Sequence, residues 1–168
     1  MSSLASNNVD LNIKSDPRDR PISKITIHHM AGNFGAQNCA LSHLNSKKDV
    51  SSNYYIGTDG TIVSGVSENR RSWASGNSDN DQMAITIEVA NNSGAPDWTV
   101  SDSAYKSLIL LCADICQRYD ITLSWTGDQN GTLTCHDMFR PTECPGPYLK
   151  AKMGQIAQQV NELNNRQN

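Results

Sequence analysis

The sequence predicts an α/β fold, a single domain in which helices flank a central mixed β-sheet. Three observations favour this fold: short β-rich runs with alternating apolar residues, helical patterns between and after these runs, and no internal repeat. A chain of 168 residues is most simply one domain with a core of ordinary size. The order of the strands within the sheet cannot be read from the sequence.

The first twenty residues are polar, so we expect an N-terminal arm over residues 1–20 and the domain itself over residues 21–168. Two prolines in the run Asp16–Pro21 should interrupt any regular element there. The first core strand should follow directly, over residues 23–28.

Alternation divides the side chains of this first strand between two faces. Ile25 and Ile27 share one face, while Thr26 and His28 share the other. His28 therefore lies on the polar side at the end of the strand, where a groove could form. His29 points the opposite way, and we interpret it as a hydrogen-bonded structural histidine or as a residue that supports a neighbouring ligand.

A helix over residues 36–44 and a β-hairpin over residues 51–63 are expected next. The pair Asp59-Gly60 favours the positive φ angles of a type I′ turn, which would join the two strands of the hairpin.

The run from Ala84 to Val89 predicts a second apolar strand. Its alternation places Glu88 on the polar face, as the first strand places His28. An edge strand or a solvated face would explain a lone glutamate here without any function. We favour the functional interpretation because both polar side chains then belong to the same kind of face.

Two longer helices complete the predicted fold. Ser101 is the expected N-cap of the first, in which apolar residues recur at helical spacing from Tyr105 to Tyr119. The last helix should run from about Pro147 to Leu163. The apolar stripes of both helices predict packing in the core rather than a cofactor site.

Composition narrows the classes of partner. A net charge of −3 without a basic stripe gives no reason to expect nucleic acid, and no apolar run is long enough to cross a membrane. The five cysteines are an odd number, which argues against a disulfide framework. We expect Cys39, Cys112 and Cys116 to be buried, and alternation points Cys135 into the core.

The clearest chemical signal lies between Thr134 and Pro147. His136 and Cys144 stand there with seven residues between them, in a loop rich in proline and glycine that can fold back on itself. Imidazole and thiolate groups are favourable zinc ligands, but two are too few. His28 is the favoured third ligand, and His43 is the competing one.

These motifs occur in an order that resembles the zinc-dependent N-acetylmuramoyl-L-alanine amidases of the type 2 family, which includes phage endolysins, bacterial autolysins and amidase-active peptidoglycan recognition proteins. The resemblance rests on the runs Ile27–Ala31, Ala84–Val89 and His136–Gly146, and it spans nearly the whole chain. It implies the fold of these amidases and peptidoglycan as the substrate. It also implies a Zn²⁺ ion held by His28, His136 and Cys144.

Catalytic roles follow from the same resemblance. Glu88 matches the glutamate that serves as general base in endolysins of this family. Other members use a tyrosine and a lysine at positions that are Ser52 and Thr142 here, which places this chain with the glutamate-dependent subgroup. Thr142 could still donate a hydrogen bond to the oxyanion. Asp137 could orient an imidazole, and Trp73 could contact substrate.

The leading function is hydrolysis of the amide bond between N-acetylmuramic acid and L-alanine by a phage or prophage endolysin. Without a visible signal peptide, such a protein would stay in the host bacterial cytoplasm until its release to the cell wall; a secreted autolysin that has lost its leader is the alternative. A wall-binding domain outside this chain could supply targeting. Three other functions stay open: a cytosolic amidase that recycles soluble muropeptides, a non-catalytic peptidoglycan-binding module, and a hydrolase with Cys144 as nucleophile.

Overall fold

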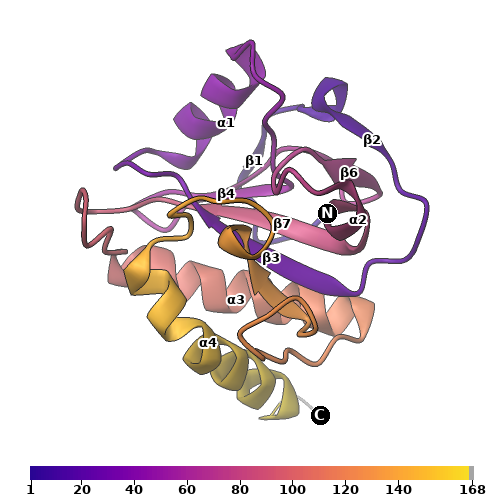
Figure 1. The fold of residues 1–168 in the computed structure, drawn as a ribbon, viewed down its shortest axis with the longest axis vertical. Helices are drawn as coiled ribbons and strands as arrows, with labels where there is room; N and C mark the ends of the chain where they lie inside the picture. The colour runs from indigo at the N-terminus through magenta and orange to yellow at the C-terminus, as the bar shows by residue number, and fades with distance from the viewer. Residues whose placement is uncertain (167–168) are drawn as a thin grey trace.

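A six-stranded mixed β-sheet lies at the centre of the structure, with the strand order β1-β5-β4-β7-β3-β8 (Figure 1). The computed structural model describes residues 1–166. Neighbouring strands are parallel except for the antiparallel pair β4 and β5. The strands are β1 (Asn7–Asn8), β3 (Lys24–His29), β4 (Tyr54–Ile56), β5 (Ile62–Ser64), β7 (Ala84–Val89) and β8 (Leu133–Cys135). The predicted fold class, with its mixed sheet, is confirmed.

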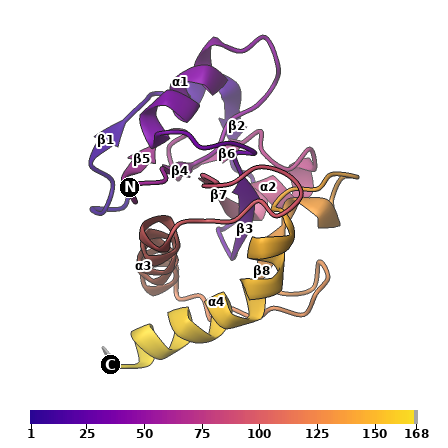
Figure 2. The ribbon, with the colours of Figure 1, turned by 90° about the vertical axis from the view of Figure 1, so that its left-hand side faces the viewer.

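Helices cover both faces of this sheet (Figure 2). Helix α1 (Ala36–Asn45) lies on one face, and α3 (Asp102–Tyr119) and α4 (Pro147–Arg166) lie on the other. The short helix α2 (Ser78–Met83) directly precedes β7. Within residues 1–166, no helix has both the length and the apolar character needed to span a membrane.

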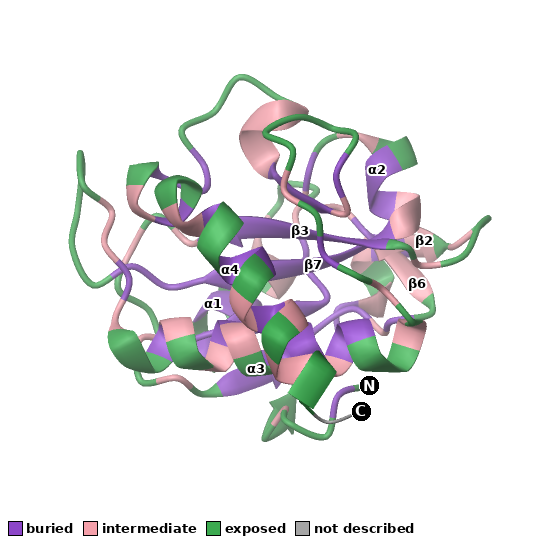
Figure 3. Ribbon diagram, turned by 90° about the horizontal axis from the view of Figure 1, so that it is seen from below, coloured by how far each residue is buried: buried purple, intermediate pink, exposed green. Residues whose placement is uncertain are grey.

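Each face of the sheet has its own apolar core. The larger core packs against α3 and α4 and includes Ile25 and Ile27, while the smaller one packs against α1 and includes Tyr55. Strands β3 and β7 are buried along their whole length (Figure 3). Because side chains alternate along β3, His28 faces the side of the sheet that α1 covers.

The ends of α3 show how local sequence defines a helix. The side chain of Ser101 accepts a hydrogen bond from the backbone N–H of Ala104 at 3.1 Å, as expected of an N-cap. Asp120 follows the last helical residue with a φ of 54°, a left-handed conformation that ends the helix. All five cysteines are free and buried, and Cys135 lies in the larger core as expected.

The hairpin of β4 and β5 is confirmed, but the type I′ turn is wrong. Gly60 has a φ of 86°, whereas Asp59 is not among the residues with positive φ. The backbone N–H of Gly60 donates to the Gly57 carbonyl at 2.9 Å, and the Asp59 carboxylate accepts from the N–H of Thr61. The turn is therefore longer than a two-residue type I′ turn, and the positive φ falls on its last residue, Gly60. A Cβ at Gly60 would also lie 2.9 Å from the carbonyl oxygen of Ser103.

The N-terminal segment forms regular structure, although its prolines were expected to prevent it. Strand β1 extends the main sheet beside β5, a 3-10 helix η1 covers Asn12–Lys14, and β2 (Ser15–Pro17) pairs with β6 (Arg70–Ser72) in a second, two-stranded sheet. Pro17 is tolerated because it ends its strand. Leu11 between the two strands is fully buried.

Two cations of the same segment bind backbone carbonyls where helices end, a position that favours positive charge. The Lys14 ammonium donates to the carbonyls of His43 and Ser46, at the end of α1, and to that of Lys48. The Arg18 guanidinium donates to four carbonyls around the end of α2, those of Glu68, Asp81, Gln82 and Ala84.

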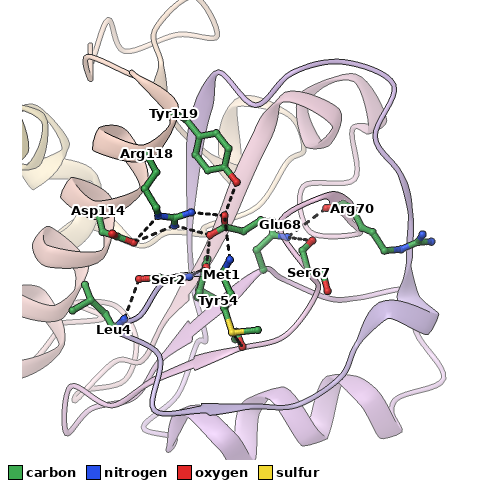
Figure 4. A network of polar contacts seen from close by, with 12 residues as sticks. Met1, Ser2, Leu4, Tyr54, Ser67, Glu68, Arg70, Asp114, Arg118 and Tyr119 are labelled. Atoms are coloured by element: carbon green, nitrogen blue, oxygen red, sulfur yellow. Dashed lines mark hydrogen bonds and ion pairs between the residues drawn. The ribbon is translucent and has the colours of Figure 1, made fainter.

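A buried carboxylate, Glu68, connects the loop after β5 to the end of α3 (Figure 4). Arg118 donates to both of its oxygens, at 2.7 and 2.8 Å, and the hydroxyls of Tyr54 and Tyr119 donate to it as well. Burial alone would raise the pKa of Glu68, but the hydrogen bonds from Arg118, Tyr119 and Tyr54 outweigh it and lower that pKa to about 2.

Candidate metal centre and active site

The ends of two parallel strands bring His28 and His136 together. Ile27 of β3 is paired with Cys135 of β8, so the residues that follow each of them become neighbours at the same edge of the sheet. His136 begins a short 3-10 helix, η2 (His136–Met138), and its ring centroid lies 4.7 Å from that of His28.

The loop after η2 folds back and adds the third donor. Cys144 is buried, and its Sγ lies 3.8 Å from Nδ1 of His28. One donor atom from each of His28, His136 and Cys144 can be chosen so that all three lie within 4.8 Å of one another. The structure thus brings together the three residues that the sequence nominated.

The chemistry of this cluster suits a zinc ion. Two imidazoles and one thiol are a donor set typical of zinc, which leaves a fourth position for substrate or water in catalytic sites. Nδ1 of His28 faces Sγ of Cys144 at 3.8 Å, a separation that fits two ligand atoms on one zinc ion. The backbone N–H of His29 donates to Sγ of Cys144 at 3.3 Å, a contact that stabilises the thiolate form.

Burial determines the protonation of these groups. It lowers the pKa of His28 well below its usual value, and it lowers that of His136 despite an opposing effect of the Ser75 backbone. Both imidazoles are therefore neutral and able to bind a metal. Burial also raises the pKa of the Cys144 thiol well above its usual range. Because a nucleophilic cysteine needs a lowered pKa, the structure disfavours Cys144 as a nucleophile.

Glu88 lies beside the cluster on the next strand. It is directly paired with His28 in the parallel register of β3 and β7, so the two side chains occupy the same face. Strand β7 is interior to the sheet and Glu88 is only 7% exposed, which excludes an edge or a solvated position. Burial raises the pKa of Glu88 to about 8. A nearby cation would oppose this increase.

Thr142 lies on the exposed part of the loop that carries Cys144. Its Oγ1 accepts a hydrogen bond from the backbone N–H of Cys144 at 3.2 Å. The hydroxyl therefore helps to shape the loop, and its hydrogen stays available to a substrate oxygen. Ser52, at the position of the family's tyrosine, is fully buried.

Two residues near the cluster, His43 and Asp137, do not belong to it. Nδ1 of His43 lies 2.7 Å from the Tyr55 hydroxyl, and His43 does not belong to the donor cluster. Asp137 binds Lys150 and accepts from Sγ of Cys135, so the expectation that it orients an imidazole is wrong.

His29 packs edge-on against Trp98, with ring centroids 5.2 Å apart. Its Nδ1 has no hydrogen-bond partner within the described part of the chain, so the side chain is not the hydrogen-bonded histidine we expected. The backbone of His29, through its bond to Cys144, is what supports the cluster.

A cavity of about 630 Å³ opens beside His136. Asp16, Arg71 and Trp73 contribute to its lining, together with residues of the loop that leads into α2. The sequence drew attention only to Trp73. No local sequence pattern marks Asp16 or Arg71 as a cavity residue, because they meet only through the pairing of β2 with β6.

The comparisons with known proteins agree with this geometry. The sequence model of the N-acetylmuramoyl-L-alanine amidase family matches residues 18–147. No curated protein sequence matches the chain.

Several solved structures share the fold. PlyL is 17% identical over 92% of this chain and 95% of its own, with a TM-score of 0.73. AmpD is 20% identical over 94% and 96%, with a TM-score of 0.71. The endolysin N-acetylmuramoyl-L-alanine amidase LysCS from Clostridium intestinale URNW is 25% identical over 90% and 96%, with a TM-score of 0.60. Since the family match covers most of the sequence, the chain belongs to the N-acetylmuramoyl-L-alanine amidase family and is a peptidoglycan amidase.

Proposed function

We propose that this amidase is zinc-dependent, with His28, His136 and Cys144 as its ligands, and that it acts as an endolysin on intact cell walls. The observation that carries the zinc assignment is the convergence of these three donors beside a buried glutamate. A non-catalytic binding module would not need this arrangement. A bound zinc ion would polarise the scissile carbonyl and help to deprotonate the attacking water.

Glu88 is the general base in this proposal. Its carboxylate takes a proton from the attacking water and passes it to the amine of L-alanine as the amide bond breaks. Burial raises the pKa of Glu88, and a cation held by the neighbouring cluster would lower it and keep the carboxylate ionised, as a general base must be. The Thr142 hydroxyl, which is exposed beside the cluster, donates a hydrogen bond to the oxyanion.

The endolysin role is supported by the similarity to LysCS, whose name describes an endolysin. In this role the enzyme is made in the host bacterial cytoplasm and meets the wall after release. Its substrate is the glycan strand together with the attached stem peptide, and a wall-binding domain outside this chain could add affinity.

Mass spectrometry of the fragments released from purified peptidoglycan tests both parts of the proposal. Stem peptides that begin with L-alanine should appear, and a chelator should abolish their release. Cleavage that survives chelation would refute the zinc assignment. Cleavage of soluble muropeptides with intact sacculi left untouched would refute the endolysin role and favour a recycling amidase.

A further inference from the structure

The wall of the cavity beside His136 is assembled from two distant parts of the chain. Arg71 belongs to β6, and Trp73 is the first residue after that strand. Asp16 belongs to β2 in the N-terminal segment. The two strands are antiparallel, and Asp16 is the register partner of Arg71. The family match covers residues 18–147, so it includes Arg71 and Trp73 but not Asp16.

One oxygen of Asp16 connects the three side chains. Its Oδ2 accepts a hydrogen bond from the indole Nε1 of Trp73 at 2.8 Å and forms an ion pair with the Arg71 guanidinium. The Arg71 side chain is 17% exposed and the Asp16 side chain 46% exposed, so solvent screens this ion pair only in part. The carboxylate thereby fixes the direction of the indole ring.

The backbone of Trp73 depends on the same segment. Its N–H donates to Oγ of Ser51 at 2.9 Å, and Ser51 in turn donates to the carbonyl of Lys14 at 2.7 Å. Ser51 also donates its own N–H to the Trp73 carbonyl at 3.1 Å. The N-terminal segment therefore holds the indole directly, through Asp16, and the backbone of Trp73 indirectly, through the bond between Ser51 and Lys14.

The indole N–H of Trp73 is already bonded to Asp16. Trp73 can therefore offer a ligand only the apolar surface of its ring. An indole surface of this kind packs well against the C–H face of a sugar or against a small apolar side chain. Such contacts depend on the orientation of the ring, and they lose strength when the ring rotates freely.

We propose that Asp16 is a positioning residue for substrate: by holding Trp73 and Arg71, it fixes the groove wall on which the sugar-peptide substrate packs next to His136. Asp16 acts through its neighbours and takes no part in the chemical step. This inference rests on the proposed amidase function for the nature of the ligand.

The test compares Asp16→Ala with the matched control Asp19→Ala, because alanine removes the oxygen that accepts from both Trp73 and Arg71. Asp19 is 58% exposed, pairs with Arg20 and does not line the cavity. On a soluble muramoyl tripeptide, Asp16→Ala should raise KM about tenfold and change kcat less than about twofold, since about 1.4 kcal/mol of binding is lost. The control should leave both unchanged. An unchanged KM in a folded Asp16→Ala variant would overturn the proposal.

Calorimetric titration of the same muramoyl tripeptide into metal-free protein separates this inference from the amidase assignment. Asp16→Ala should weaken binding about tenfold here too. If metal-free wild type binds the tripeptide but the zinc-loaded enzyme does not cleave it, the catalytic proposal fails and the titration still decides on Asp16. If wild type does not bind the tripeptide, the inference on Asp16 fails.

A double-mutant cycle shows whether Asp16 acts through the indole. Trp73→Phe keeps an aromatic ring and removes the indole N–H, so adding Asp16→Ala to it should raise KM much less than adding it to wild type. Full additivity would overturn the proposal. If Asp16→Ala lowers the melting temperature strongly, Asp16→Glu replaces it in all three measurements, with a KM between those of wild type and Trp73→Phe expected.

Discussion

At the scale of single residues, the cluster depends on a thiol that the fold keeps out of water. Cys144 is buried, its pKa is raised by that burial, and the N–H of His29 points at its sulfur. Without a metal, burial therefore favours the protonated thiol, and a bound cation would be needed to displace that proton and stabilise the thiolate.

Cys144→Ser should therefore lose zinc and activity together, because a hydroxyl is a far poorer zinc ligand than a thiolate. Metal analysis by mass spectrometry and the peptide-release assay measure the two effects. The matched control is His43→Ala, which removes a nearby half-buried histidine from outside the cluster and should keep the metal. Zinc loss in the control, or a zinc-free variant of Cys144 with full activity, would contradict the ligand assignment.

Glu88→Gln should retain zinc and lose about 10²–10⁴-fold in kcat, the usual contribution of a general base. The amide keeps the shape of the side chain but cannot accept the proton. Zinc content and kcat of the purified variant check this expectation. A rate near that of wild type would mean that another group acts as the base.

Alternation was enough to place His28 and Glu88 on one face, because the period of a strand leaves no choice once its apolar residues are known. The binding partners of Asp137 and Asp16 could not be predicted from alternation. Asp137 binds Lys150 of α4, and Asp16 binds Arg71 of β6. Each contact depends on how elements pack, which no local pattern records.

At the scale of elements, long periodic segments were predictable and short polar ones were not. Helix α3 could be predicted from its N-cap residue and from the helical spacing of its apolar residues. Helix α2 has six residues of which five are polar, and β6 consists of two arginines and a serine. Both depend on the N-terminal segment: Arg18 binds carbonyls at the end of α2, and β2 pairs with β6.

Arg18→Met tests how far α2 depends on the N-terminal segment. Four carbonyls would lose their charged donor, so we expect the free energy of unfolding to fall by about 3 kcal/mol. Burial lowers the pKa of Arg18 to about 10, so the side chain is charged at neutral pH. Urea denaturation gives the value. Arg20→Met, which alters a neighbouring arginine engaged in exposed ion pairs, should change stability by less than about 1 kcal/mol.

At the scale of the whole molecule, the Glu68 network joins the N-terminus, the sheet and α3. The amino group of Met1 lies 3.9 Å from the carboxylate that Arg118, Tyr54 and Tyr119 share. A carboxylate whose pKa is lower in the folded than in the unfolded protein stabilises the fold above its unfolded pKa, and this contribution is lost as the pH falls through the folded value.

For Glu68 that window extends from about pH 4.5 down to about pH 2. Glu68→Gln should therefore lower the stability of metal-free protein at pH 7 by about 3 kcal/mol and should flatten its dependence on pH within this window. Urea denaturation at several pH values measures both effects. Glu162→Gln, at an exposed position on α4, should follow the wild-type profile. Parallel profiles for Glu68→Gln and wild type would contradict the assigned role.

The pairing of β3 with β8 has a consequence for the order of events during synthesis. Thr26 and its partner Thr134 are 108 residues apart, so β3 cannot gain its second neighbour until most of the chain has left the ribosome. Until then one side of β3 remains an open sheet edge, prone to pair with other chains. His28 meets His136 and Cys144 only when that edge closes. A nascent or truncated chain that ends before residue 133 should therefore lack the metal centre and should tend to aggregate.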